Sequence, residues 1–589
     1  MAINSSNATA DNSALLDISS DNKGVLIPRM TVTERNAIAS PATGLIIYQT
    51  NSDPGFYYNA GTTTTPQWTK VGGTDYWGIS GNAGTVTGTN FIGTTDNVPI
   101  YFKVNNTNSG SIVPALFNTS FGYNALPNPS QGSNTAFGQN ALNGNTTEAR
   151  NTSVGSESMQ NNTIGYENIA IGTYSLLSNQ ASSTNISIGN YALYMQSYDP
   201  GYSWPSHNIA LGSEALLLNQ PMSISNGSKN IAIGSYALRN NGTGYHNTAM
   251  GFNALYNNAS GWANVAVGNY SQNGSFDGSS NTSTGYNSLV INTRGSRNTA
   301  LGVNALALQN YTPGTTFNSD NVAVGLSALY NNQPTSTSNG INNTAVGTFA
   351  LLNNTIGYSN TAAGFQSAYN TNTGFFNTSM GAYSMVTNAS GSWNTAVVYN
   401  TGPSVNNISN TTCIGTDATA TATDMVRIGN SFVNSIGGNV GWTTLSDGRF
   451  KEDVDENIPG LSFITQLRPV TYRIDREALN EFTGVTARHT EIRSQQPGME
   501  FSSGERYSGV TTGFIAQEVE AAAENLGFSF SGVDAPKNEN DMYGLRYADF
   551  VVPLVKGMQE QQAQIEELKA ANAMLMEKLA NLEKELSGR

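Results

Sequence analysis

A short pattern that recurs along the middle of the chain limits the folds open to this sequence. The pattern is Asn-x-Ala/Ser-apolar-Gly-x-x-Ala-Leu, and most copies follow one another at the same short step, as from Asn230 to Asn247 and on to Asn264. Its 17 copies begin at Asn118, Asn134, Asn151, Asn168, Asn185, Asn208, Asn230, Asn247, Asn264, Asn281, Asn298, Asn321, Asn343, Asn360, Asn377, Asn394 and Asn410. A short fixed period is typical of folds in which each repeat packs against its neighbours. We therefore expect a stacked repeat structure here.

Each copy has the composition of a short strand followed by a turn. In Asn-x-Ala-apolar-Gly the side chains alternate, so the small and the apolar residue should face opposite ways. Glycine permits positive φ, asparagine tolerates such turns, and Ala-Leu supplies a second apolar contact. At about 4.8 Å per strand, the copies would form a shaft of roughly 80 Å. One copy cannot bury its own apolar face, so we expect neighbouring copies, and sister chains as well, to cover it.

The array departs from its regular period in two places. The steps that lead to Asn208, Asn230, Asn321 and Asn343 are longer than the others. Asn321 follows Asn208 at the same offset as Asn343 follows Asn230, which indicates a longer period. In the last two copies, Val398 replaces the glycine and Asp417-Ala418 replaces Ala-Leu. Such decay at one end is expected of a cap.

The longer steps should extrude loops that carry aromatic residues. One loop covers residues 194–207 and another covers 309–320. Their aromatic residues include Tyr198, Tyr202 and Trp204 in the first loop, and Tyr311 and Phe317 in the second. Exposed aromatic rings can stack on the faces of sugars. We expect packing against the next subunit, with receptor contact through Tyr198, Tyr202 and Trp204 as the alternative.

The array resembles the β-roll and β-prism shafts of trimeric bacterial adhesin heads and phage tail fibres. This resemblance implies a mainly β fold with an elongated trimeric shaft, built as a β-roll, β-prism or solenoid. A β-solenoid of unrelated purpose is the alternative interpretation.

Charge and residue usage exclude several function classes. The net charge of −14 and the pI near 4.7 argue against binding to nucleic acid or to an anionic membrane. No apolar run approaches the roughly 18 residues of a membrane span, and the start MAINSSNATADNSALL lacks the features of a secretory signal. A single cysteine, Cys413, allows no intrachain disulfide. The three histidines are isolated, so we expect no metal site and no cofactor.

The N-terminal residues predict a small β-rich module. Residues 45–48 and 55–58 are typical of two strands of a hairpin, and residues 31–39 predict a short helix. Thr31 or Thr33 would cap this helix, with Glu34 in its first turn. The arrangement resembles the N-terminal modules that attach phage and bacterial tail fibres to a larger structure. A small β-domain that only starts the fibre is the alternative.

Three motifs follow the array, in a region much richer in charge. Charged residues make up 11% of the chain, and 39 of the 66 fall in residues 446–589. The motifs are SDGRFK from Ser446, LRPVTY from Leu467 and GFIAQEV from Gly513. In this order they resemble the intramolecular chaperone of endosialidases and phage tail spikes, an auto-processing serine peptidase. The resemblance extends from Ser446 to the end of the chain and departs from the family's minimal form by a polar insertion at 475–508.

The resemblance implies that this region drives trimer assembly and then cuts the chain between Leu445 and Ser446. Ser446 would be the nucleophile and Lys451 the general base, while Asp447 and Arg449 match the motif in structural roles, as do Gly513, Gln517 and Glu518. A serine hydroxyl needs a base, and lysine serves only when neutral, which burial favours. We therefore expect Lys451 to be buried in the assembled state.

Two observations leave the catalytic role open. Four carboxylates beside the lysine favour its charged form. They belong to Glu452, Asp453, Asp455 and Glu456. A turn-capping serine and a solvated lysine are the alternative interpretation.

The end of the chain carries leucine heptads. Apolar residues alternate at steps of three and four, which predicts a parallel coiled coil. The seam runs through Val551, Leu554, Met558, Gln561, Ile565, Leu568, Asn572, Leu575, Leu579, Leu582 and Leu586. Asn572 at a core position would fix the register. A single helix packed on its own domain is the alternative.

These observations favour a homotrimeric tail-fibre or spike protein that attaches to a host or target cell. Its expected partners are two further copies of itself, a tail or baseplate protein at its N-terminus, and a glycan or protein receptor on a cell surface. We expect no nucleic acid and no membrane insertion. The protein would be made in the bacterial cytoplasm and act in a virion tail or a contractile injection particle.

Two other functions are alternatives. A polysaccharide-degrading spike would need paired carboxylates, whereas Glu157, Glu167, Glu214 and Asp320 are scattered. A surface adhesin without enzymatic activity would need a secretion signal and an anchor.

The expected domains follow from the changes in pattern. They are an attachment or collar module at 1–75, a β-rich neck at 76–117, the shaft at 118–430, a linker at 431–445, the chaperone and auto-processing domain at 446–550 and the coiled coil at 551–589.

Overall fold

The computed structural model describes residues 1–4, 8–72, 77–78, 81–128, 132–147, 149–311, 314–496 and 509–588. The chain forms two compact units, Met1–Asp96 and Asn97–Arg589.

The first unit contains a four-stranded sheet and one short helix. The sheet has the order β3 (Arg29–Met30), β4 (Ile46–Gln49), β5 (Gly55–Asn59) and β6 (Trp68–Lys70). A separate pair consists of β1 (Ala2–Asn4) and β2 (Asp17–Ser19). The predicted hairpin is confirmed, because β4 and β5 pair antiparallel. Helix α1 (Val32–Asn36) is shorter than expected, and Thr31 and Glu34 form its capping box.

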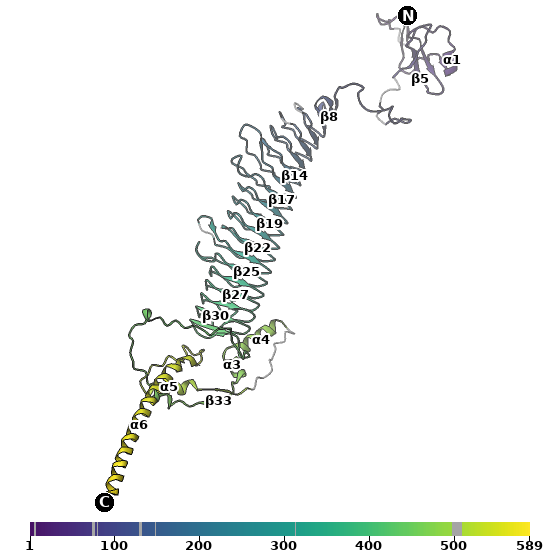
Figure 1. Cartoon of the computed structure of the whole chain (residues 1–589). Coiled ribbons are helices and arrows are strands. Elements are labelled where there is room, and N and C mark those ends of the chain that lie inside the picture. The colour runs from purple at the N-terminus through teal and green to yellow at the C-terminus, as the bar shows by residue number, and fades with distance from the viewer. Residues whose placement is uncertain are drawn as a thin grey trace. The chain divides into compact units, whose positions relative to one another are not determined.

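The repeat array forms a β-solenoid, the last of the three predicted shaft types (Figure 1). Each of the 17 copies supplies one short strand, and each strand pairs in parallel with the strand of the next copy. The strands are β9 (Asn118–Phe121), β10 (Thr135–Phe137), β11 (Thr152–Val154), β12 (Ile169–Ile171), β14 (Ile186–Ile188), β16 (Ile209–Leu211), β17 (Ile231–Ile233), β18 (Thr248–Met250), β19 (Val265–Val267), β20 (Thr282–Thr284), β22 (Thr299–Leu301), β24 (Val322–Val324), β25 (Thr344–Val346), β26 (Thr361–Ala363), β27 (Thr378–Met380), β28 (Thr395–Val397) and β30 (Thr411–Ile414).

Further elements extend the solenoid at both ends. Strands β7 (Ile100–Val104) and β8 (Thr107–Val113) pair antiparallel with each other, and β8 pairs with β9, so residues of the expected neck continue the shaft's ladder. A 3-10 turn, η1 (Pro114–Leu116), lies between β8 and β9. At the other end β32 (Met425–Ile428) pairs with β30. Short parallel pairs add to the side of the stack, namely β13 (Ser182–Ser183) with β15 (Trp204–Pro205), β21 (Gly295–Ser296) with β23 (Phe317–Asn318), and β29 (Gly402–Pro403) with β31 (Thr419–Ala420).

The interior of the solenoid is closed within one chain. The small residue of each strand points inward and the next apolar residue points outward, as Ala249 (0% exposed) and Met250 (41% exposed) illustrate. The residues at the Ala-Leu positions are also buried, for example Ala254 and Leu255. Neighbouring turns alone therefore bury this core, and the expected help of sister chains is not needed for it.

The repeated glycine is required by the stacking of the turns. Gly251 has a φ of 136°, and a Cβ there would lie 2.6 Å from the carbonyl carbon of Gly268 in the next turn. No side chain fits at that distance, and the conformation itself favours glycine.

The repeated asparagine is buried and hydrogen-bonded along the stack. The Asn247 backbone N–H donates to Asn230 Oδ1 at 3.1 Å, and the Asn264 N–H donates to Asn247 Oδ1 at 3.0 Å. A second buried ladder lies later in each turn, where Asn258 Nδ2 donates to Asn241 Oδ1 at 2.7 Å. Asparagine was expected to serve the turns. Its main role is instead to satisfy buried polar groups between the turns.

The longer steps occur at two equivalent places in the array, and the contacts there are the same. Gln196 and Gln309 replace asparagine in the second ladder, and each accepts hydrogen bonds from two asparagines of the next turn. The longer glutamine side chain occurs in the two turns from which the longest steps start.

The C-terminal region combines short helices, two small antiparallel pairs and one long helix. Its helices are α2 (Leu461–Ile464), α3 (Arg476–Phe482), α4 (Val485–Gln495), α5 (Ala516–Glu524) and α6 (Val551–Ser587), with 3-10 turns η2 (Gly448–Phe450) and η3 (Tyr547–Phe550). The pairs are β33 (Val470–Tyr472) with β34 (Thr511–Gly513), and β35 (Val533–Asp534) with β36 (Gly544–Leu545). Phe463, Val519 and Phe550 form the centre of its core. Within the described residues, none of the helices combines the length and the apolar character of a membrane span.

Candidate functional site

The predicted cleavage site lies in an exposed segment without regular structure. No helix or strand is assigned from residue 431 to residue 447, all of which are described, and Leu445 is 80% exposed. Ser446 is exposed as well. The bond between these two residues is therefore accessible in the single chain.

The Asp-Gly-Arg turn that follows brings Ser446 and Lys451 together. Asp447 caps η2, because its Oδ1 accepts the Arg449 backbone N–H at 2.9 Å. Arg449 also forms an ion pair with Asp447 at 2.6 Å, and these hydrogen bonds lower the pKa of the Asp447 carboxyl. The turn reverses the chain, so Lys451 Nζ donates a hydrogen bond to Ser446 Oγ at 2.9 Å.

This pair has the geometry of a nucleophile beside its base. A candidate base must lie about 2.6–3.2 Å from the group whose proton it removes, and the observed distance meets this requirement. Lys451 is exposed, however, and the predicted burial does not occur in the single chain. Among the described residues no ion pair joins Lys451 to the four nearby carboxylates.

The other two motifs form one scaffold. Val470 and Gly513 are paired in the β33–β34 ladder, and Arg468 forms an ion pair with Glu518. Gly513 leaves room for Tyr547, whose hydroxyl oxygen accepts the Phe514 backbone N–H at 3.1 Å.

Gln517 is exposed at the wall of a hollow of about 840 Å³ in this scaffold. In the described part of the chain, no hydrogen bond or ion pair connects this scaffold with residues 446–451. The structure thus joins the second motif to the third and leaves the first motif apart.

Of the predicted receptor residues, only Tyr202 is largely exposed, at 56%. Trp204 is 2% exposed; it lies on β15, and its ring forms a T-shaped contact with Tyr198, with 5.9 Å between the ring centroids. The alternative of receptor contact is therefore wrong for Trp204 in this chain, and its ring packs within its own chain, whereas packing against the next subunit was expected.

Three of the four scattered acids of the shaft lie within ion-pair distance of an arginine. Glu167 pairs with Arg150, Glu214 pairs with Arg239 at 2.7 Å, and Asp320 lies 3.8 Å from Arg297. Among the described residues no group of three His, Cys, Asp or Glu side chains could hold a metal ion.

His489 was expected to be an isolated residue, but it is part of a polar network. Its Nε2 lies 2.8 Å from Asp417 Oδ1, on the last copy of the repeat. The decayed repeat at Asp417 and the polar insertion were both visible in the sequence, but nothing in their spacing linked them.

Comparisons with known protein families match both ends of the chain. Residues 2–88 match the phage tail like trimerisation region, and residues 446–528 match the chaperone of endosialidase. The second match begins at Ser446. A search of curated proteins found no match. With a trimerisation region at one end, a β-solenoid in the middle and an endosialidase-type chaperone region behind it, the chain has the plan of a trimeric phage-type tail fibre or spike.

Proposed function

We propose that this protein is a fibre for attachment to a cell surface, and that its C-terminal region assembles three chains and then cuts each one between Leu445 and Ser446. The observation that carries the cutting step is the 2.9 Å hydrogen bond between Lys451 Nζ and Ser446 Oγ, next to an exposed bond. This function is compatible with a phage tail and with a contractile injection particle.

The proposed reaction is a self-cleavage in two steps. Ser446 Oγ attacks the carbonyl carbon of Leu445 while Lys451 takes the hydroxyl proton. The Leu445–Ser446 peptide bond breaks, an ester forms in its place, and the proton passes to the amine that leaves. Water then hydrolyses the ester, which gives a carboxylate at Leu445 and a free fragment that begins at Ser446.

Assembly would control this reaction through the state of the lysine. In the single chain Lys451 is exposed and donates to Ser446, whereas a base must accept a proton. Loss of water around a lysine favours its neutral form. Sister chains that cover the linker would supply this loss of water, and Val440 and Trp442, both more than four-fifths exposed, offer them an apolar surface.

The long helix α6 would hold the three chains together. Its predicted seam is open to solvent in one chain, with Leu568, Leu575 and Leu579 all more than half exposed. An apolar stripe of this length on one helix is typical of a coiled coil whose partners are absent.

Attachment would use surfaces that occur twice in each chain. A groove of about 600 Å³ is lined by Gln220, Asn240 and Asn257, and a second of about 500 Å³ is lined by Gln333, Asn353 and Asn370. The three residues of the second groove occupy the duplicated positions of the first three. Three chains would present six such grooves, and multivalent contact strengthens weak binding to a repetitive cell-surface glycan.

Intact mass of the wild type and of Ser446→Ala tests the cutting step. The wild type should yield a fragment that starts at Ser446, and Ser446→Ala should remain at 62.3 kDa. Full-length mass for both proteins would remove the peptidase from the proposal.

A binding assay with neutral polysaccharides tests attachment through the grooves. It compares the uncut fibre that has wild-type grooves with a variant that carries Asn240→Ala and Asn353→Ala.

A further inference from the structure

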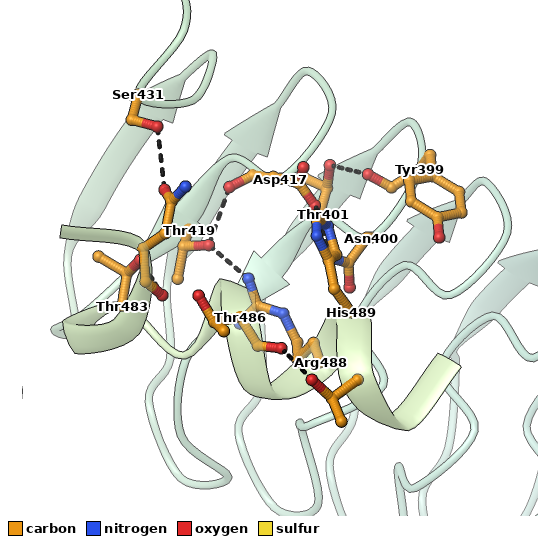
Figure 2. A network of polar contacts seen from close by, with 12 residues as sticks. Tyr399, Asn400, Thr401, Asp417, Thr419, Ser431, Thr483, Thr486, Arg488 and His489 are labelled. Carbon is orange, nitrogen blue, oxygen red and sulfur yellow. Dashed lines mark hydrogen bonds and ion pairs between the residues drawn. The ribbon is translucent and has the colours of Figure 1, made fainter. Parts of the chain in front are cut away.

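Helix α4, within the polar insertion of the C-terminal region, lies against the end of the solenoid. Helix α4 approaches the turn that carries Asp417 and Thr419, as Figure 2 shows, and this turn precedes the last strand of the stack. The end of a solenoid exposes a core that no further turn covers, so it needs a cap. Residues that follow the linker lie at this end.

A buried charged side chain on α4 forms a hydrogen bond with the shaft. Arg488 is 6% exposed and donates to Thr419 Oγ1 at 2.7 Å. Burial lowers the pKa of its guanidinium, while the nearby Asp417 acts in the opposite direction. His489 adds its contact with Asp417, which itself accepts a hydrogen bond from Asn400 at 2.5 Å.

The apolar side chains of α4 share the face that carries this arginine. Val485, Arg488 and Ile492 follow at steps of three and four residues, so they lie on one side of the helix. Val485 is 5% exposed and Ile492 is 3% exposed. Since Arg488 contacts the shaft, this side of α4 is the one that faces the solenoid.

A second contact comes from the loop between β35 and β36. Asp541, 7% exposed, accepts a hydrogen bond from Thr421 Oγ1 at 2.6 Å. Asn538 Nδ2 donates to the Thr421 carbonyl oxygen at 3.1 Å. Although burial acts to raise the pKa of Asp541, the hydrogen bonds from Thr421 and from two backbone N–H groups lower it overall.

These contacts join residues on the two sides of the proposed cleavage site. Thr419 and Thr421 precede it, while Arg488 and Asp541 follow it, and both charged side chains are buried. Removing one partner of a buried charge is strongly unfavourable. Residues 433–446 are exposed and contribute little to this attachment, whereas Ser431 Oγ at the start of the linker donates to Asn480 Oδ1 at 2.9 Å.

We propose that α4 and the β35–β36 loop form a cap that keeps the C-terminal region bound to the shaft after the linker is cut. The chain would then remain one particle, with the solenoid end covered, whether or not the covalent connection persists. This inference goes beyond the proposed self-cleavage and does not require it.

Cleavage of the linker by an added protease tests the cap independently of the proposed self-cleavage. A recognition sequence for a specific protease is placed between Gly437 and Gly441 in the Ser446→Ala protein, so that only the added protease cuts. After digestion, size-exclusion chromatography under native conditions should show both fragments in one peak. Separation of the fragments as soon as the linker is cut would overturn the proposal.

Substitutions in α4 and in the β35–β36 loop test which residues hold the C-terminal fragment on the shaft. Arg488→Ala combined with His489→Ala should weaken retention of the C-terminal fragment by about a hundredfold, as expected when a buried charge contact is lost. Glu491→Ala, an exposed position on the same helix, is the matched control and should retain the fragment. Asp541→Asn probes the second contact if the double variant does not fold. Retention as tight as in the control for both contact variants would show that the cap does not hold the fragment.

Discussion

At the scale of single residues, the proposed cleavage depends on Lys451. The motif predicted Ser446 and Lys451 as partners, and the turn capped by Asp447 places them 2.9 Å apart. The hydrogen bond has the lysine as donor, which is the resting arrangement. The proposed reaction requires the same lysine to accept a proton, and Lys451 is exposed in the single chain.

Lys451→Arg separates the two roles. Arginine keeps the positive charge and can still donate to Ser446, but it does not lose its proton in proteins. We expect this variant to assemble as the wild type does and to remain uncut, a loss of about a hundredfold or more in cleavage rate. Intact mass over time measures the rate, and cleavage at the wild-type rate would show that Lys451 is not the base.

For the repeated strand and turn, the sequence predicted the strands and their inward side chains but not the function of the asparagines. Alternation and glycine placement are local properties, so the 17 strands follow directly from the pattern. Asparagine is common in turns, and its spacing cannot distinguish a turn from a buried ladder. Only the stacked structure shows that Asn241 and Asn258 bond to each other.

Asn258→Ala tests the stabilising effect of the second ladder. The change removes the donor to Asn241 Oδ1, a buried acceptor, and should lower the free energy of unfolding by about 1–3 kcal/mol. Denaturant unfolding measures the difference. Gln220→Ala, at an exposed position, should change stability by less than about 0.5 kcal/mol, and equal effects of the two changes would contradict a structural role of the ladder.

The long helix α6 provides a second prediction for a single element. Leu575→Asp with Leu579→Asp places carboxylates in the seam, and burying unpaired carboxylates costs several kcal/mol. We expect the cut fraction to fall by about tenfold or more, because assembly precedes cutting. Met576→Asp is the control, since Met576 is similarly exposed but lies off the seam. An equal cut fraction in the wild type, the double variant and the control would show that cleavage does not depend on the seam of α6.

At the scale of the whole molecule, the contacts between segments distant in the sequence could not be predicted from the sequence. Asp417 and His489 are 72 residues apart, and neither the repeat period nor the motifs connect them. The order of the regions and the motif residues were predictable, because each region carries its own pattern. The proposed cap was not predictable, because it depends on how the C-terminal region packs against the end of the repeat array.

The proposed function rests above all on the association of three chains, brought together by the C-terminal region. The solenoid core is closed in one chain, so the shaft itself does not require this association. The Ser446→Ala protein keeps each chain intact, and its native mass by light scattering should be three times 62.3 kDa. The same protein ending at residue 437 should lose the ordered trimer. A native mass of one chain for the intact protein, or an unchanged ordered trimer after the truncation, would contradict this mode of assembly.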